Sequence, residues 1–318
     1  MNKKRIIIDC DPGYDDAVAL LLAAGHPDVD VLAVTTVAGN QTIDKVTRNA
    51  MRVGAFCGLT GIPYAAGARR PLLRPAVVPA PEIHGETGLD GCELPEPGFE
   101  RDARSAAQLI VDIVMREPAG TVTLVPTGPL TNIALAARIE PAIVGRVREV
   151  VLMGGGACVG NVTPVAEFNI ENDPEAAHIV FGEAWPLTML GLDVTYQARA
   201  GRAWRDALRA RPGRFSAFLH DVLEGFAAMY KVARGFDEPP VHDACAVAYV
   251  IDPTIFKTRR THIAVECAGR LTTGMTVCDM REPEPAHSHQ RIALALDRDR
   301  FWALLTTALD RLERGGAS

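Results

Sequence analysis

Short apolar runs alternate with amphipathic stretches along most of the chain. The runs are rich in β-branched residues and end at turn residues, a pattern typical of buried strands. They cover residues 5–9, 29–37, 122–125, 150–153 and 187–190. Between them, apolar residues recur at helical spacing and stop at glycines or after capping residues. The clearest predicted helices cover residues 15–24, 42–57 and 105–117.

This alternation predicts an α/β fold. Strands separated by helices favour a mostly parallel central sheet with helices on both faces, in an open Rossmann-like arrangement. In such sheets a ligand binds beyond the carboxyl ends of the strands. We therefore look for candidate chemistry at those ends.

Two segments break the pattern. Residues 67–104 are rich in proline and glycine and show no periodicity, and a loop of that length in a compact protein is usually functional. Residues 199–230 are expected to be wholly helical and carry aromatic side chains, which predicts a helical cap near the active site. There is no internal repeat and no obvious linker, so we expect one domain spanning residues 1–318.

Composition narrows the possible partners. With 48% hydrophobic residues the chain can bury a sizeable core, and a net charge of −6 argues against a nucleic-acid-binding surface. Asp9 and Asp11 interrupt the apolar run that begins at Ile6, so we expect neither a signal peptide nor a membrane span. The seven cysteines are odd in number and never spaced C-x-x-C, which favours free thiols and a cytoplasmic location.

The segment of residues 9–16 concentrates acidic side chains where a strand passes into a helix. Asp15 and Asp16, taken alone, fit ordinary helix caps. Asp11 precedes the helix and has no such role. Holding these three carboxylates together is costly unless a cation joins them. Oxygen donors without an adjacent histidine favour Ca²⁺ or Mg²⁺ over zinc.

The same segment has a competing interpretation. Asp9-x-Asp11 after an apolar strand resembles the aspartyl nucleophile loop of haloacid-dehalogenase-type phosphatases, which use Mg²⁺. Those proteins typically continue with Gly-Thr, whereas this chain continues with Pro12-Gly13. A phosphatase that uses Asp9 as its nucleophile is therefore the weaker alternative.

Polar groups also follow the other predicted strands. Asn40 and Thr127 each lie just beyond a strand, and a backbone carbonyl at Thr127 could face a metal, although both segments also fit ordinary turns. The glycine run at 154–156 lacks the G-x-G-x-x-G and G-K-[ST] patterns of phosphate loops. Beyond it, amide and carboxylate side chains suited to sugar hydroxyls occur at Asn161, Glu167 and Asn169.

Two histidines complete the set of candidates. His84 lies in the long unpatterned loop, where a lone histidine is usually just solvated. His242-Asp243 begins an apolar helix, where Asp243 could be a plain N-cap and His242 a structural histidine. Each of these interpretations is reasonable for the isolated residue.

Taken together, these segments resemble the inosine-uridine nucleoside hydrolase family along nearly the whole chain. Seven short motifs occur in the family's order, including Asp11-Pro12-Gly13-Tyr14-Asp15-Asp16-Ala17 and Glu167-Phe168-Asn169. The others are residues 38–40, 83–85, 126–132, 153–155 and 242–243. One such match could be chance, but seven in order are specific.

The resemblance implies a set of roles. Ca²⁺ would bind Asp11, Asp16, Asp243 and the backbone carbonyl of Thr127, with Asp11 also the general base. The ribose would contact five residues, namely Asp15, Asn40, Asn161, Glu167 and Asn169. The base would contact His84, Phe168, Tyr230 and His242, with His242 the candidate leaving-group acid.

The resemblance also implies an activity: hydrolysis of the N-glycosidic bond of ribonucleosides to free base and ribose. Tyr230 lies twelve residues before His242, as in broad-specificity members, which tilts the expected preference towards inosine and uridine alike. The substrate would be a small ribonucleoside, used in purine or pyrimidine salvage, and the protein a homotetramer or dimer. A non-catalytic nucleoside-binding relative is disfavoured because every charged position of the site is present.

Overall fold

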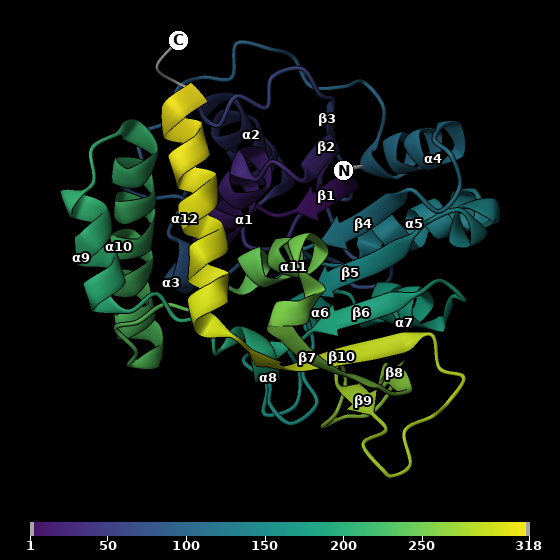
Figure 1. Ribbon diagram of the computed structural model, residues 1–318. Helices are drawn as coiled ribbons and strands as arrows, with labels where there is room; N and C mark the ends of the chain where they lie inside the picture. The colour runs from purple at the N-terminus through teal and green to yellow at the C-terminus, as the bar shows by residue number, and fades with distance from the viewer. Residues whose placement is uncertain (1–2, 316–318) are drawn as a thin grey trace.

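The computed structural model describes residues 3–315, and its centre is an eight-stranded sheet of strand order β3-β2-β1-β4-β5-β6-β10-β7 (Figure 1). Every neighbouring pair is parallel except β10 and β7. The strands are β1 (Lys4–Cys10), β2 (Val29–Thr36), β3 (Tyr64–Ala66), β4 (Val122–Pro126), β5 (Glu149–Met153), β6 (Leu187–Leu190), β7 (Phe256–Arg260) and β10 (Gln290–Leu296). A separate antiparallel hairpin is formed by β8 (Ile263–Val265) and β9 (Thr276–Cys278).

Helices cover both faces of this sheet, which confirms the predicted α/β fold. They are α1 (Tyr14–Gly25), α2 (Ile43–Phe56), α3 (Pro81–His84), α4 (Ala106–Arg116), α5 (Thr131–Ile139), α6 (Phe168–Asn172), α7 (Pro174–Gly182), α8 (Leu192–Thr195), α9 (Arg202–Ala210), α10 (Arg214–Arg234), α11 (His242–Ile251) and α12 (Arg298–Gly315). Short 3-10 helices occur at Pro141–Gly145 and Pro253–Ile255.

The central strand β1 shows why the apolar runs are continuous. Ile6 and Ile8 pack into the core formed with α1, α11 and α12, whereas Ile7 packs into the core formed with α4, α5 and α7. All three side chains are buried. A strand covered on both faces has no solvent side, so its sequence does not alternate between apolar and polar residues.

The prediction that residues 199–230 are wholly helical is wrong, because the helix is interrupted. The structure has two helices there, α9 and α10, which pack against each other and are joined at residues 211–213. Pro212 cannot donate a backbone hydrogen bond, and Gly213 adopts φ 122°, so the helix must end and restart. α10 then runs past α3, on the outer side of α12 in Figure 1.

The long loop also differs from the expectation. Within residues 67–104 the short helix α3 ends at His84, so this segment is not entirely without regular structure. Backbone amides of the loop are held by two polar residues at the C-terminal end of α6: Leu72 N donates to Asp173 Oδ2, and Val78 N donates to Asn172 Oδ1 (both 2.9 Å). These bonds give the loop a defined path around the strand ends.

The strand order places a crevice beside β1. The connection from β1 leads to β2 on one side, and β4 pairs on the other, so the direction of winding reverses between β1 and β4. Ligands of open α/β sheets bind at this point, beyond the carboxyl ends of the strands. Asp11 and Thr127 follow those two ends, which places the predicted chemistry at the reversal.

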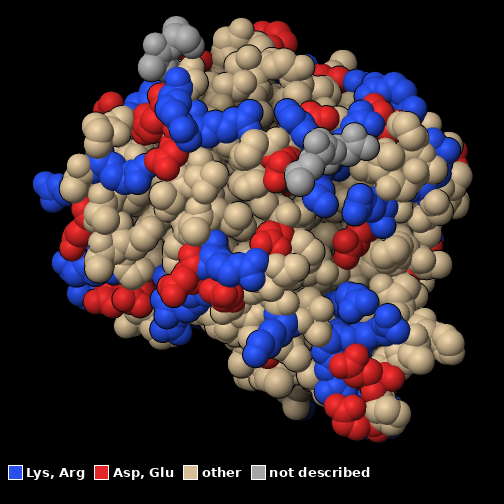
Figure 2. All heavy atoms as spheres, in the orientation of Figure 1, with Lys and Arg blue, Asp and Glu red and all other residues tan. Residues whose placement is uncertain are grey.

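The surface charges are of both signs, and the cysteines are free thiols, as the composition predicts. The face shown in Figure 2 mixes Lys and Arg with Asp and Glu. All seven cysteines are free. Among residues 3–315, no helix has the length and apolar character needed to cross a membrane.

Candidate active site

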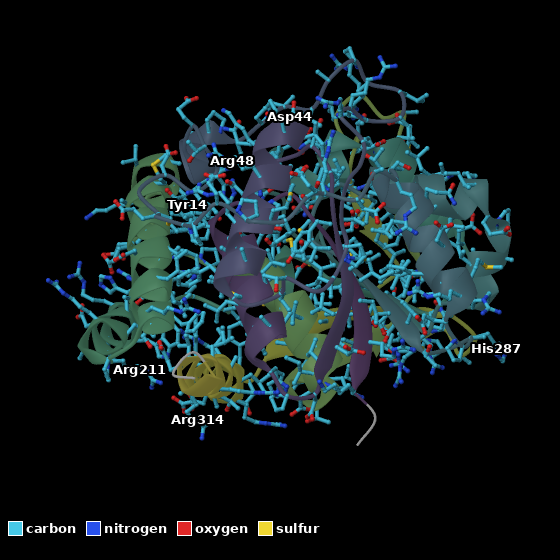
Figure 3. The ribbon with its side chains drawn as sticks, turned by 90° about the horizontal axis from the view of Figure 1, so that it is seen from above. Tyr14, Asp44, Arg48, Arg211, His287 and Arg314 are labelled. Atoms are coloured by element: carbon cyan, nitrogen blue, oxygen red, sulfur yellow. The ribbon has the colours of Figure 1, made fainter. Side chains whose placement is uncertain are left out.

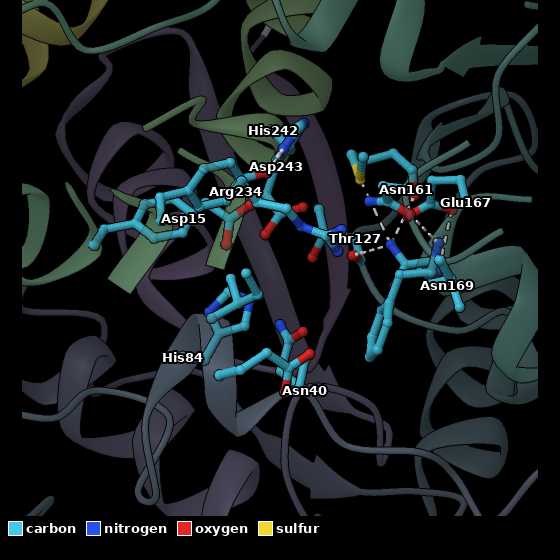
Figure 4. Close-up of a pocket in the computed structure, with 18 residues that line it drawn as sticks. Asp15, Asn40, His84, Thr127, Asn161, Glu167, Asn169, Arg234, His242 and Asp243 are labelled. Atoms are coloured by element: carbon cyan, nitrogen blue, oxygen red, sulfur yellow. Dashed lines mark hydrogen bonds between the residues drawn. The ribbon is translucent and has the colours of Figure 1, made fainter. Parts of the chain in front are cut away.

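A pocket opens at the carboxyl edge of the sheet and is lined by almost all of the residues predicted from the sequence (Figure 4). The space between its lining residues, counted to the open mouth, is about 600 Å³. The predicted residues that line it are Asp15, Asn40, His84, Thr127, Asn161, Glu167, Phe168, Asn169, Tyr230, His242 and Asp243. The remaining two, Asp11 and Asp16, are fully buried and hydrogen-bond to residues of the lining.

Acidic oxygens converge on one side of this pocket. Oxygen atoms of Asp15, Asp16 and Asp243 lie within 4.8 Å of one another, and all three residues are buried. Burial raises the pKa of each carboxyl group above its usual range. Asp15 Oδ1 has no hydrogen-bond partner among the described residues. Such a group of oxygens suits a hard divalent cation, which would offset its charge.

Asp11 lies beside this group in a slot that only glycines allow. Its Oδ2 accepts a hydrogen bond from Asn40 N (2.6 Å), and its Oδ1 is buried without a partner among the described residues. A Cβ added to Gly39 or Gly128 would lie 2.0 or 2.7 Å from a carboxylate oxygen of Asp11. These glycines of the sequence motifs therefore make room for the carboxylate. Burial, and then the nearby charge of Asp16, raise the pKa of Asp11 well above its usual range.

The structure therefore brings together only some of the residues that the resemblance implies as Ca²⁺ ligands. Asp16 and Asp243 come together as expected, but the third member of the tight trio is Asp15, for which the resemblance implies a ribose contact, and not Asp11. The carbonyl oxygen of Thr127 accepts a hydrogen bond from Asn169 Nδ2 (2.8 Å). The assignment of Asp11 and Thr127 as ligands stays a prediction.

The opposite side of the pocket carries the amide and carboxylate groups predicted for the sugar. Glu167 caps α6, and its Oε2 accepts hydrogen bonds from Gly155 N (2.9 Å) and Asn169 N (3.0 Å). Burial raises the pKa of Glu167 to about 7. Asn161 Oδ1 accepts a bond from Phe168 N (2.9 Å). Backbone amides thus fix one oxygen of each side chain, and the other polar atom can meet a ligand.

Aromatic rings form a third wall. Tyr14, which begins α1 and faces α10 (Figure 3), stacks on Phe226 with ring centroids 5.5 Å apart. His84 stacks on Phe226 at 5.7 Å, and Tyr230 meets Phe226 edge-on at 5.1 Å. Rings in this arrangement suit a planar nucleobase.

His242 is held between two hydroxyl groups. Its Nδ1 lies 2.7 Å from Thr195 Oγ1, and its Nε2 lies 3.2 Å from the hydroxyl of Tyr230. Burial lowers the pKa of His242 to about 3, so the imidazole is neutral at neutral pH. Either hydroxyl can donate or accept, so these contacts are compatible with both tautomers.

Sequence reasoning missed several lining residues, among them Glu82, Met153, Phe226 and Arg234. Phe226, Tyr230 and Arg234 follow each other at intervals of four on α10, so they share one face of that helix. This spacing could have identified Phe226 and Arg234 once Tyr230 was chosen. Met153 begins the motif of residues 153–155 at the end of β5 and could also have been identified, whereas Glu82 carries no comparable pattern.

The structure gives no support to a phosphatase site at Asp9. This side chain is fully buried and does not line the pocket. Its Oδ1 accepts hydrogen bonds from Thr35 Oγ1 (2.7 Å) and Asn132 Nδ2 (2.8 Å), two residues that tie neighbouring elements to β1. Asp9 is thus held by structural hydrogen bonds to residues outside the pocket lining, which disfavours it as a nucleophile.

Known proteins resemble this chain in both sequence and structure. Residues 6–303 match the model of the family described as "Inosine-uridine preferring nucleoside hydrolase". The protein of that name from Crithidia fasciculata is 51% identical over 310 residues, 97% of this chain and 98% of the relative. "Pyrimidine-specific ribonucleoside hydrolase RihA" of Shewanella baltica is 44% identical over 96% of each chain. The solved "Purine-Preferring Ribonucleoside Hydrolase from Gardnerella vaginalis" superposes with a TM-score of 0.90 at 30% identity, covering 98% of this chain and 99% of that one.

Proposed function

The chain belongs to the inosine-uridine preferring nucleoside hydrolase family, and from this premise we propose how its pocket performs the reaction. The protein is an N-glycosidase that hydrolyses ribonucleosides to free base and ribose. The observation that carries the assignment of the site is that acidic, amide and aromatic groups line different walls of one pocket. Hydrolysis of a nucleoside needs all three kinds of group: acidic groups to activate water, amide groups to bind the ribose hydroxyls, and aromatic groups to contact the nucleobase.

We propose Ca²⁺ as the cofactor, held by Asp11, Asp16, Asp243 and the Thr127 carbonyl. The buried oxygens of Asp11 and Asp15 that lack partners support a cation here, since unpaired buried carboxylates are costly. The absence of thiol or imidazole groups from the acidic trio favours a hard ion. When bound, such an ion offsets the acidic charge and lowers the pKa of water.

Asp11 is the proposed general base. Asn40 N holds its Oδ2, which leaves Oδ1 to accept a proton from the attacking water. Attack at the anomeric carbon passes through an oxocarbenium-like state, as in other glycoside cleavage. Asp15, Asn40, Asn161, Glu167 and Asn169 would bind the ribose hydroxyls. Contacts that strengthen as the ring flattens lower the barrier.

The finer biological assignments are also proposals. A preference for inosine and uridine is supported by the 51% identity to a relative with that name, compared with 44% to a pyrimidine-specific one. We further propose one domain over residues 1–318, a cytoplasmic homotetramer or dimer, and a role in purine and pyrimidine salvage. Light scattering of the purified protein tests the assembly, and a monomer would refute it.

Replacing Asn169 or Asp15 by alanine is expected to lower kcat/KM for inosine and uridine alike, by about 10²-fold or more. The reason is that the ribose is identical in both substrates, so lost hydroxyl contacts affect them equally. Steady-state kinetics on the two nucleosides measures this. By the same reasoning 2′-deoxyribonucleosides should be poor substrates. A loss confined to one base would show that these residues do not act on the ribose.

Replacing His242 by alanine is expected to slow inosine hydrolysis by about 10²- to 10⁴-fold. The same change should cost much less with 4-nitrophenyl riboside, whose leaving group needs no proton. The imidazole of His242 is neutral before substrate binds. To protonate the departing base it therefore has to be resupplied with a proton by a group hydrogen-bonded to the ring, such as the Tyr230 hydroxyl. Equal losses on the two substrates would mean that His242 only shapes the pocket.

A further inference from the structure

The tautomer of His84 is determined by the backbone. The Nδ1 atom of this imidazole accepts a hydrogen bond from the main-chain N–H of Tyr14 (3.3 Å). A hydroxyl group could act in either direction, but a main-chain N–H can only donate. A neutral imidazole has one donor and one acceptor nitrogen, so with Nδ1 accepting, the hydrogen must be on Nε2.

Several contacts keep the ring in this orientation. Tyr14 lies over it with ring planes 26° apart, and Phe226 stacks on it with planes 29° apart. The hydroxyl of Tyr14 is itself tied to the Asp90 carbonyl (2.9 Å). At Gly13 an added Cβ would lie 2.1 Å from His84 Nδ1, so glycine is what allows the loop to approach the imidazole. Burial lowers the pKa of His84 to about 3, which keeps the ring neutral.

The other nitrogen is left for a ligand. His84 Nε2 has no hydrogen bond to any described residue, and it is not among the buried atoms that lack a partner, so it is accessible. His84 lines the pocket on the side across from His242 (Figure 4). An N–H in a largely apolar aromatic wall binds best to a group with a free lone pair.

We propose that the loop between β1 and α1 locks His84 in the Nε2–H form, so that the base subsite presents one fixed hydrogen-bond donor. This inference rests on the proposed function and names what the subsite selects: nucleobases that place a carbonyl oxygen or an unprotonated ring nitrogen at His84. Tyr14 is then a positioning residue, because it acts on the base through His84. Residues 11–16, which carry the acidic side chains of Asp11, Asp15 and Asp16, would thereby also decide that the base meets a hydrogen-bond donor at His84.

The direct test is the tautomer itself. Long-range ¹H–¹⁵N correlation spectra of protein labelled at its eight histidines separate protonated from unprotonated ring nitrogens. A His84→Gln variant identifies the signals of His84 by their loss, and the exposed His287, at the far edge of Figure 3, provides a reference for a solvated ring. At about pH 7 we expect unprotonated Nδ1 and protonated Nε2. Protonated Nδ1, an imidazolium or an exchanging mixture would overturn the proposal.

Two variants test the cause of the lock. Tyr14→Phe keeps both the main-chain N–H and the ring, and should leave the spectrum of His84 unchanged. Gly13→Ala should displace the imidazole and give a mixture of tautomers. If Gly13→Ala folds and retains the pure Nε2–H form, the loop does not set the tautomer.

The functional consequence is measured separately. His84→Met removes the donor and should raise KM for inosine and uridine about tenfold, the effect of one lost hydrogen bond, with little change in kcat. His84→Gln keeps an N–H and should recover most of the loss. Equal KM values for the two variants would refute the donor role. Because the tautomer is observed without turnover, failure of the proposed function and failure of this inference are distinguishable.

Discussion

Replacing Asp11 by alanine is expected to reduce the turnover of inosine and uridine by at least about 10³-fold while the protein stays folded. The carboxylate follows β1 at the reversal point of the sheet, and one of its oxygens is held by Asn40 N. The other oxygen has no partner among the described residues, and burial raises its pKa, so its removal relieves an unfavourable buried carboxylate, which offsets the loss of the hydrogen bond from Asn40 N. Steady-state kinetics and urea unfolding of the variant measure both effects.

The control is Asp44→Ala. This aspartate of α2, labelled in Figure 3, is exposed, pairs with Arg69 and is not among the residues that line the pocket. Exposed ion pairs contribute at most about 1 kcal/mol, so this variant should retain normal turnover. If Asp11→Ala instead folds and retains most of its activity, Asp11 is not the base.

Added Ca²⁺ is expected to stabilise the protein more at pH 8 than at pH 5. Burial raises the pKa of Asp15, Asp16 and Asp243 above their values in the unfolded chain. Without a cation, the stability linked to these groups is present at low pH and is lost as the pH rises through the raised values. A cation bound to the ionised groups offsets this loss. At a concentration 1,000-fold above its Kd the gain would be about 4 kcal/mol.

Chemical denaturation across this pH range, with and without Ca²⁺, measures the gain. The matched variant is Asp243→Asn, which removes one charge from the acidic trio. Without Ca²⁺ it should be more stable than the wild type at pH 8, and it should gain less from the ion. A gain that does not vary with pH, or a larger gain with Zn²⁺ than with Ca²⁺, would rule out the proposed site.

Most of the central sheet could be predicted because its strands are buried on both faces. β1, β2, β4, β5 and β6 therefore appear as apolar runs that no polar residue interrupts for long. β7 was missed because its residues Lys257 to Arg260 are mostly polar and only partly buried. The break at Pro212-Gly213 could have been read from the sequence, but the amphipathic pattern on either side obscured it.

The site could be predicted only as a set of segments. The motifs, matched in order along the chain, identified residues that lie far apart in the sequence. The fold brings most of these residues into one pocket. Orientation could not be predicted, because the position of a carboxylate depends on side-chain rotation and on contacts made elsewhere. Asp15 thus joins Asp16 and Asp243, while Asp11 turns towards Asn40 N. Nor could spacing show that Tyr14 would donate to His84, which lies 70 residues further along.

The most direct measurement is the release of ribose and free base from a panel of ribonucleosides, with and without a calcium chelator. We expect inosine and uridine to yield base and reducing sugar in equal amounts, and the chelator to stop both until Ca²⁺ is restored. Phosphate monoesters, assayed in parallel, should release no phosphate. Full activity in the chelated protein would contradict the metal site, and phosphate release without ribose release would contradict the hydrolase account itself.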